Sequence, residues 1–275
     1  MKLIEKIERE LDQDYAIVID GPDYIAINEH ESFNPASTIK LYILYAGLVA
    51  METKKIHKDD TIEIKAKEIV PGAGVIQYLS ARKYTLDDLL TLMIAYSDNT
   101  ATNVMLDVLS IDYIQSIVES LGLKETFVRR KLYHMIPGVF NASSASDLNI
   151  ILHHIYEGIG ISKDLSDYGK EIMKKQQYKN IGAKLLTCAR CKKIISDNTC
   201  TCGLYIGDVD PIMVPVYSKS GEITGHVHDA CIIDIQGQPI YVTILTSRQK
   251  NNLETKEKLG KIGLMIYNHY KEVLC

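Results

Sequence analysis

The sequence predicts an α/β (α+β) protein: a three-layer antiparallel sheet with flanking helices, joined to an all-helical subdomain. Two short β-rich runs, residues 15–20 and 24–27, flank the turn sequence GPD and predict a hairpin. From Ala36 to about Ser166 the pattern is mainly helical, and strand-like runs return at residue 212. Because two strands alone are not stable, the first hairpin is expected to pair with the late strands, so that both ends of the chain build one sheet.

Local sequence patterns predict where several helices form. Apolar residues at helical spacing predict a first helix over residues 2–12. Thr85 is expected to cap a helix in which Asp88 supports the first turn. Ser144 and Asp147 repeat this arrangement in a later helix. Local caps therefore mark where two of the middle helices begin.

The end of the chain combines strands with one long helix. Alternating and continuous apolar runs predict strands at 212–220, 229–235 and 239–247. An amphipathic pattern over about 253–272 predicts the closing helix. Cys231 falls in the second of these runs and is expected to be a buried strand residue.

Two subdomains follow from this order. Residues 1–35 and 180–275 are expected to form an α/β subdomain built by both termini, and residues 36–179 an all-helical subdomain. Residues 184–210 form a Cys-rich insertion within the α/β part. A groove between two such subdomains is a common place for a ligand site.

Composition limits the classes of partner. The chain has 275 residues and a net charge of -4, which favours neither nucleic acid nor an anionic membrane. Its start lacks the apolar core and cleavage site of a secretory signal, and its longest apolar run, residues 41–51, is too short to cross a bilayer. We therefore expect a cytoplasmic protein with no nucleic-acid or membrane partner, although an export signal trimmed from the sequence would leave the same pattern.

A serine and a lysine stand together at the start of the first middle helix. Pro35 suits a first-turn position, and Ser37 then lies where backbone N–H groups are unpaired. Lys40 follows one turn later on the same face, in an otherwise apolar run. Burial lowers the pKa of a lysine, and a neutral amine beside a hydroxyl is a base that can make the serine nucleophilic. Alone, the pattern is more often a helix cap with a lysine reaching for solvent.

Two further triplets change that interpretation. Ser97, Asp98 and Asn99 form S-D-N, and Lys219, Ser220 and Gly221 form K-S-G at the end of a late strand. In this order, with S-x-x-K at Ser37 and Lys40, they resemble the serine β-lactamase and penicillin-binding-protein superfamily. The separations of the motifs and stretches such as GAGVIQYL and LTLMIAYSDNTATNVML are similar to its class A branch. The resemblance covers nearly the whole chain outside about 184–210, and it implies a β-lactamase-like fold.

The resemblance implies a role for each motif residue. Ser37 would be the acylated nucleophile, Lys40 its base, and Ser97 the relay of a proton to the leaving nitrogen. Asn99 would hold the substrate amide and the Lys40 side chain, and the backbone N–H groups of Ser37 and Glu222 would form the oxyanion hole. The remaining residues would bind substrate, its carboxylate at Lys219 and Ser220 and its backbone along Gly221. Asp98 is expected to cap the following helix.

One part of the class A pattern is missing. That branch uses a glutamate on a loop after S-D-N to activate the hydrolytic water, whereas no carboxylate stands between Glu125 and Asp147. Arg130 would match the loop's arginine. His134 is interpreted as a surface or packing histidine and Glu125 as a solvated charge. Without a positioned base, hydrolysis of the acyl-enzyme should be slow.

Three functions therefore compete, all with a small-molecule β-lactam or D-peptide-like substrate. The first is a serine hydrolase of the β-lactamase family, acting by acyl transfer on β-lactam rings with slow deacylation. The second is a peptidase or esterase acting on D-amino-acid peptides or small acyl substrates. The third is a penicillin-binding sensor that is acylated without turnover. None of them requires a cofactor for catalysis.

Four cysteines crowd into fifteen residues of the insertion. Cys188, Cys191, Cys200 and Cys202 follow the pattern C-x2-C-x8-C-x-C. Four thiolates this close can hold a tetrahedral structural zinc ion; reduced thiols or local disulfides are the alternatives. The resemblance offers no guidance, because the family does not normally carry this insertion.

Overall fold

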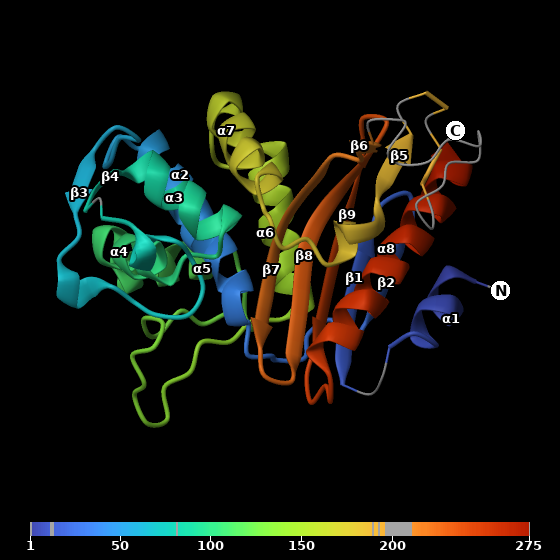
Figure 1. Ribbon diagram of the computed structural model, residues 1–275, viewed down its shortest axis with the longest axis horizontal. Coiled ribbons are helices and arrows are strands. Elements are labelled where there is room, and N and C mark those ends of the chain that lie inside the picture. The colour runs from blue at the N-terminus through green and yellow to red at the C-terminus, as the bar shows by residue number, and fades with distance from the viewer. Residues whose placement is uncertain are drawn as a thin grey trace.

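The centre of the protein is a five-stranded antiparallel sheet with strand order β2-β1-β9-β8-β7 (Figure 1). The computed structural model describes residues 2–11, 14–80, 82–188, 190–191, 193–195 and 211–274. The five strands are β1 (Tyr15–Asp20), β2 (Tyr24–Ile27), β7 (Val216–Ile223), β8 (His226–Ile235) and β9 (Gln238–Thr246). Strands from both ends of the chain are thus joined in one sheet, with β7 at its edge.

Helices cover both faces of this sheet (Figure 1). They are α1 (Leu3–Glu8), α2 (Lys40–Glu52), α3 (Leu86–Ala95), α4 (Asn99–Leu109), α5 (Ile111–Ser120), α6 (Ala145–Glu157), α7 (Lys163–Lys174) and α8 (Asn252–Leu274). The 3-10 turns of the described residues are η1 (Ala36–Ile39), η2 (Ala66–Glu68), η3 (Ile76–Tyr78) and η4 (Ile181–Lys184). Helices α1 and α8 lie on one face, while α6 and α7 contact the other. No helix within these described ranges is both long and apolar enough to span a bilayer.

The core is divided by the sheet because strand residues alternate between its faces. In β1, Ala16 and Val18 join the larger apolar cluster, which contains α2 and α6. Ile17 and Ile19 point into the other cluster, with α1 and α8. All four side chains are fully buried, so this strand is sandwiched between two layers of helices.

The predicted fold class is confirmed, and so is the pairing of the chain ends. The hairpin forms at the predicted residues, and β1 pairs with β9 in a register that opposes Ile17 to Ile244. Thr85 and Asp88 form a reciprocal capping box on α3, and the Ser144 hydroxyl accepts a hydrogen bond from the Asp147 N–H on α6.

Two element predictions were wrong in detail. The single strand expected at 212–220 is broken before β7, because Pro215 has no N–H to donate to a sheet. Its first part, β6 (Pro211–Met213), pairs instead with β5 (Leu186–Cys188).

The first helix ends at Glu8, where a turn to the Ile7 carbonyl follows. A helix this short depends on packing more than on propensity, and Leu11 is buried without being helical. The middle of the chain also contains a small hairpin of β3 (Thr61–Glu63) and β4 (Lys83–Thr85), whose strands are too short to show a period.

Candidate active site

Ser37 and Lys40 lie where a 3-10 turn becomes helix α2. Pro35 precedes this turn with a helical backbone, and Ser37 sits within η1. The Lys40 side chain points back along the helix, as helical side chains do, and places its Nζ 3.0 Å from the Ser37 Oγ. The predicted neighbourhood of amine and hydroxyl is present.

Lys40 is held by groups far away in the sequence. Its Nζ donates to the Ser97 carbonyl at 2.7 Å and lies 2.9 Å from the Ser97 Oγ. The Asn99 Oδ1 accepts a further hydrogen bond at 3.2 Å. Ser97 has a left-handed backbone with φ of 54°, which is uncommon for a non-glycine residue and typical of functional sites.

A second buried lysine approaches the same serine from the sheet. The Nζ of Lys219 on β7 lies 3.2 Å from the Ser97 Oγ and donates to the Ser220 carbonyl at 2.7 Å. The side chains of Lys40 and Lys219 are both fully buried. One hydroxyl, that of Ser97, therefore lies between two amines.

Burial changes the protonation of both amines. It lowers the pKa of Lys40 well below its ordinary value, and the nearby charge of Lys219 lowers it further, while Asp98 acts in the opposite direction. Burial also lowers the pKa of Lys219 to about 7, and the charge of Asp229 opposes this shift. Neutral amine is thus available at Lys40 near neutral pH, which is the condition for base catalysis.

The edge strand β7 lies directly against the turn that carries Ser37. A Cβ built on Gly221 would lie 2.9 Å from the Pro35 carbonyl oxygen and 3.1 Å from the Ser37 nitrogen. Only glycine leaves room for this approach. The next residue, Glu222, lines the cavity, and its carboxylate pairs with Lys256 at 2.6 Å.

Asp98 supports the site without touching the two amines directly. Its carboxylate accepts hydrogen bonds from the N–H groups of Ala101, Val75 and Ile76 at 2.7–2.9 Å. The predicted helix cap is confirmed, and Asp98 also fixes the segment that lines the cavity at Ala73. Asn99 adds a bond of 3.0 Å from its Nδ2 to the Pro71 carbonyl.

Ser37, Asn99 and Glu222 line one cavity of about 320 Å³. Lys40, Ser97, Lys219 and Ser220 are not among its lining residues. One side contains Asn34, Pro35, Ala36, Ser37, Ala73, Asn99, Glu222 and Ile223, and the other contains Arg130, Leu132, Tyr133, Met135 and Asn141. The second group belongs to residues 128–141, here called the cavity loop, which Phe127 and Ala142 close by a backbone bridge. In Figure 1 this loop stands away from the helices at the lower left. Among the described lining residues Glu222 is the one carboxylate, and it is paired with Lys256.

Two asparagines fix the cavity loop. Asn103 on α4 bonds the backbone of Leu132 twice, at 2.9 Å through each end of its amide. The Asn141 amide binds the N–H groups of Arg129 and Arg130 and the Arg130 carbonyl, at 2.8–3.1 Å. Sequence reasoning missed both, because an asparagine in a loop is usually a turn residue.

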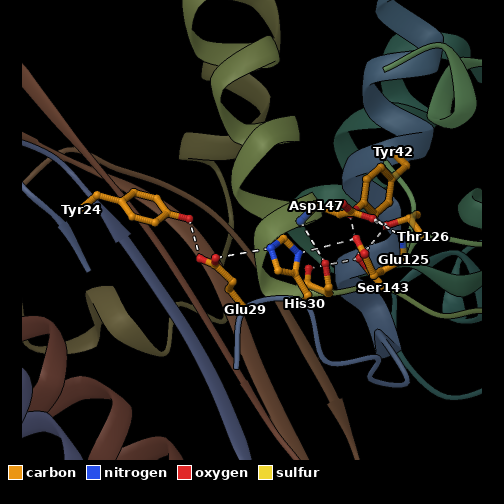
Figure 2. A network of polar contacts seen from close by, with 9 residues as sticks. Tyr24, Glu29, His30, Tyr42, Glu125, Thr126, Ser143 and Asp147 are labelled. Carbon is orange, nitrogen blue, oxygen red and sulfur yellow. Dashed lines mark hydrogen bonds and ion pairs between the residues drawn. The ribbon is translucent and has the colours of Figure 1, made fainter. Parts of the chain in front are cut away.

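A polar network holds the base of the cavity loop to the rest of the fold (Figure 2). The Asp147 Oδ2 accepts bonds from the Glu125 N–H at 3.0 Å and the Thr126 hydroxyl at 2.8 Å. Thr126 also contacts the Tyr42 and Ser143 hydroxyls. Burial, with the charge of Glu125 as a further cause, raises the pKa of Asp147 to about 6. Glu125 takes part in this network through its backbone N–H, while its carboxylate, predicted to be a solvated charge, is partly exposed and lies 3.9 Å from the His30 Nδ1.

The structure brings most of the predicted site residues together. Ser37, Lys40, Ser97, Asn99 and Lys219 are linked by the contacts above, and Ser220, Gly221 and Glu222 continue along β7. His134 is exposed, as predicted, and is not among the residues that line the cavity. The sequence did not single out Leu132, Tyr133 or Met135, since an apolar loop residue carries no catalytic signal.

The cysteine cluster lies only partly within the described residues. Cys188 ends β5 and is buried, Cys191 follows in the turn, and Cys231 is buried in β8 as expected. The Cys188 N–H donates to the Lys193 carbonyl at 2.9 Å, which closes the turn around the C-x2-C pair. Cys200 and Cys202 lie outside the described residues, and among those described no set of three metal-binding side chains is grouped. The zinc site stays a prediction.

Comparison with known proteins assigns the family. A sequence model of the β-lactamase enzyme family matches residues 2–270, and the chain belongs to this family. Among curated proteins it is 29% identical over 109 residues to β-lactamase PSE-4 of Pseudomonas aeruginosa and 28% identical over 125 residues to a β-lactamase of Bacteroides uniformis. These matches cover 39% and 40% of this chain and only 38% and 41% of those proteins.

Solved structures agree with the fold over almost the whole chain. A β-lactamase from Sphaerobacter thermophilus superposes with a TM-score of 0.83 at 22% identity, covering 97% of this chain and 96% of that one. PBP-A superposes with a TM-score of 0.78 at 22% identity, covering 98% and 96%. A leucine-to-glutamate variant of PBP-A, solved as an acyl-enzyme with penicillin G, has a TM-score of 0.79. Identities this low carry the fold alone.

Proposed function

We propose that this protein is a serine hydrolase that opens β-lactam rings by acyl transfer to Ser37 and releases the product slowly. The observation that carries the proposal is a contact between a buried amine and a cavity hydroxyl: the Lys40 Nζ, whose pKa is lowered by burial, lies 3.0 Å from the Ser37 Oγ. Family membership supports the class of reaction. The substrate and the slow second step are inferences from the residues around the cavity.

Acylation uses groups already in place. The Ser37 Oγ attacks the carbonyl carbon while its proton passes to the Lys40 Nζ. The oxyanion would be held by the backbone N–H groups of Ser37 and Glu222. When the carbon–nitrogen bond breaks, the Ser97 hydroxyl gives its proton to the leaving nitrogen and recovers one from Lys40 across 2.9 Å.

Substrate binding is assigned to β7 and to the segment after S-D-N. The charge of Lys219 and the Ser220 hydroxyl would hold the substrate carboxylate, and Gly221 lets the substrate lie along the edge strand. Asn99 would bind the substrate amide while it positions Lys40, which its Oδ1 contacts at 3.2 Å. No cofactor takes part in these steps.

Among the described residues that line the cavity, no comparable group is in place for deacylation. Water must attack the ester carbon and lose a proton while Ser37 regains one. The cavity loop presents Leu132, Tyr133 and Met135 to this space, and Glu222 is paired with Lys256. The acyl-enzyme is therefore expected to persist, which also leaves open a role as a sensor acylated by β-lactams.

Intact mass spectrometry after mixing with benzylpenicillin tests the proposal. We expect a stoichiometric adduct of one opened penicillin that lasts for minutes or longer in the wild-type protein and never forms in Ser37→Ala, whose melting temperature should be unchanged. Rapid ring opening without an adduct would contradict slow deacylation. Absence of any reaction would contradict β-lactam acylation and favour D-peptide or ester substrates.

A further inference from the structure

A buried histidine lies against the segment that leads to Ser37. His228 on β8 is fully buried, and each of its two ring nitrogens has a backbone partner. The Nε2 lies 2.8 Å from the Asn34 carbonyl oxygen, and the Thr246 N–H donates to the Nδ1 at 3.1 Å. A backbone N–H can only donate and a carbonyl oxygen can only accept. The proton of the neutral ring is therefore on Nε2, which donates to Asn34.

The surroundings of His228 keep its ring neutral. Burial lowers the pKa of His228 to about 4, and the nearby His226 acts in the same direction, while the backbone contacts at Asn34 and Val227 oppose the shift. A second proton would have to sit on Nδ1, where the Thr246 N–H already points. At neutral pH the ring therefore donates one hydrogen bond and accepts one.

The register of the sheet places this ring beside the contact between β7 and the Ser37 turn. His228 is the partner of Gly221 in the pairing of β7 with β8, and directly opposed residues share one face of a sheet. A Cβ built on Gly221 would lie 2.9 Å from the Pro35 carbonyl oxygen, so the turn approaches the sheet closely at this point. On the next strand, His228 supplies a directed hydrogen bond to the same segment.

The segment before the nucleophile has a strained backbone. Ala36 has φ of 46°, a left-handed conformation that is uncommon for a residue other than glycine and that persists where the surroundings enforce it. The Asn34 Oδ1 accepts a hydrogen bond from the Ala36 N–H at 3.1 Å. Phe33 is joined to Ser143 by two backbone hydrogen bonds of 2.9 and 3.1 Å. His228 fixes the Asn34 carbonyl between these two attachments.

We infer that His228 is a positioning residue for acyl transfer: its Nε2–H holds the Asn34 carbonyl and thereby places the hydroxyl and the N–H of Ser37. The inference rests on the proposed function, in which this hydroxyl attacks and this N–H stabilises the oxyanion. His228 is not among the residues that line the cavity, so it acts through the turn. The expected effect is large, because a misplacement of about 1 Å can cost about 100-fold in rate.

Two variants separate the hydrogen bond from the volume of the ring. His228→Gln keeps a side-chain N–H donor for Asn34, whereas His228→Phe keeps a ring but has no donor. We expect the second-order rate constant for acylation by benzylpenicillin to fall about tenfold or more in His228→Phe and to stay within about threefold of wild type in His228→Gln. An equal fall in both variants, or no fall in either, would overturn the inference.

Ser166→Ala is the matched control for lost stability. The buried Ser166 hydroxyl on α7 donates to the Ile155 and Tyr156 carbonyls at 2.9 Å, so this variant also loses buried hydrogen bonds, but at a place outside the cavity lining. Its melting temperature should fall while its acylation rate equals that of wild type. A fall in acylation as large as that of His228→Phe would show that reduced stability alone slows the reaction, which contradicts a positioning role.

The ring of His228 can also be tested without any substrate. In ¹⁵N NMR spectra of the wild-type protein, with the signals assigned by their loss in His228→Gln, we expect a protonated Nε2 and an unprotonated Nδ1 between about pH 5 and pH 8. A protonated Nδ1 would overturn the inference, even if His228→Phe fails to fold.

Failure of the positioning role and failure of the proposed function give different results. If benzylpenicillin modifies wild type and His228→Phe equally fast, acylation stands and only the role of His228 is rejected. If it does not modify the wild-type protein, the proposed function is wrong. Crystal structures of the variants then test the positioning: the Ser37 Oγ should move away from the Lys40 Nζ in His228→Phe but not in His228→Gln, and an unmoved Ser37 would overturn the inference.

Discussion

The two buried lysines that contact Ser97, Lys40 and Lys219, differ from the cavity loop in burial, polarity and origin. Both lysines are fully buried, and hydrogen bonds to three separate segments fix them. The cavity loop instead presents exposed apolar side chains, and hydrogen bonds mainly fix its backbone, at Leu132 and Arg130. The two lysines belong to the packed core, whereas the side chains of the cavity loop can change at little cost to the fold.

This difference separates the two halves of the proposed reaction. Acylation needs a neutral amine, a nucleophile and an oxyanion site, all of which depend on burial and therefore on the whole fold. Deacylation needs a water molecule and one base to activate it, and a single side chain of the loop can supply or omit that base. In the proposed mechanism the groups for acylation are therefore complete, and the side chains of the cavity loop would set the lifetime of the acyl-enzyme.

The largest expected effect comes from giving the cavity loop a carboxylate. Leu132→Glu places a base in the cavity that contains Ser37, on a backbone that Asn103 already holds. We expect the adduct to hydrolyse about 100-fold faster, within the usual range for general base catalysis. Adduct lifetime by mass spectrometry measures this, and Leu132→Gln, which has the same shape without the base, should differ from wild type by less than about threefold. An unchanged lifetime in Leu132→Glu would show that the loop does not control deacylation.

A smaller effect concerns the pH dependence of the acylation rate, which follows from the two buried lysines. The proposed acylation requires Lys40 neutral and Lys219 charged in the free protein, and burial lowers the pKa of Lys219 to about 7. Above this pH the charge that binds the substrate carboxylate is lost, so acylation by a penicillin should fall about tenfold for each further pH unit. At pH values low enough to protonate Lys40, whose pKa burial lowers well below its ordinary value, the rate also falls. An uncharged ester should show the lower limb without the upper one; a penicillin rate that stays flat to pH 9 would contradict the assigned role of Lys219.

The smallest effect concerns the attachment of the cavity loop. Asn141→Ala removes three hydrogen bonds at the loop base, which are partly accessible to water, so we expect a loss of about 1 kcal/mol in the free energy of unfolding. The acylation rate should change little, because Ser37 and Lys40 are held elsewhere. Urea denaturation and acylation kinetics on the same sample check both statements. A large loss of acylation with unchanged stability would mean that Asn141 contacts the substrate.

The sequence by itself determined the elements with short-range causes. Ser37 and Lys40 are one helical turn apart, Asp98 caps α4, and Thr85 and Asp88 form their box within four residues. The GPD hairpin and the strand runs also have local causes. So does the break at Pro215, which its missing N–H explains but the sequence analysis did not predict. Motifs and caps are readable in this way because their geometry involves only neighbouring residues.

Only the tertiary structure decided which of these residues meet and with what charge. Lys40 reaches Ser97 across 57 residues of sequence and Lys219 reaches it across 122, and their pKa values follow from burial that no local pattern contains. The same holds for the cavity loop, where Tyr133 fits over Gly72 and apolar side chains line the space beside Ser37. Packing between distant segments sets solvation, and solvation sets both the basicity of an amine and the preference of a pocket.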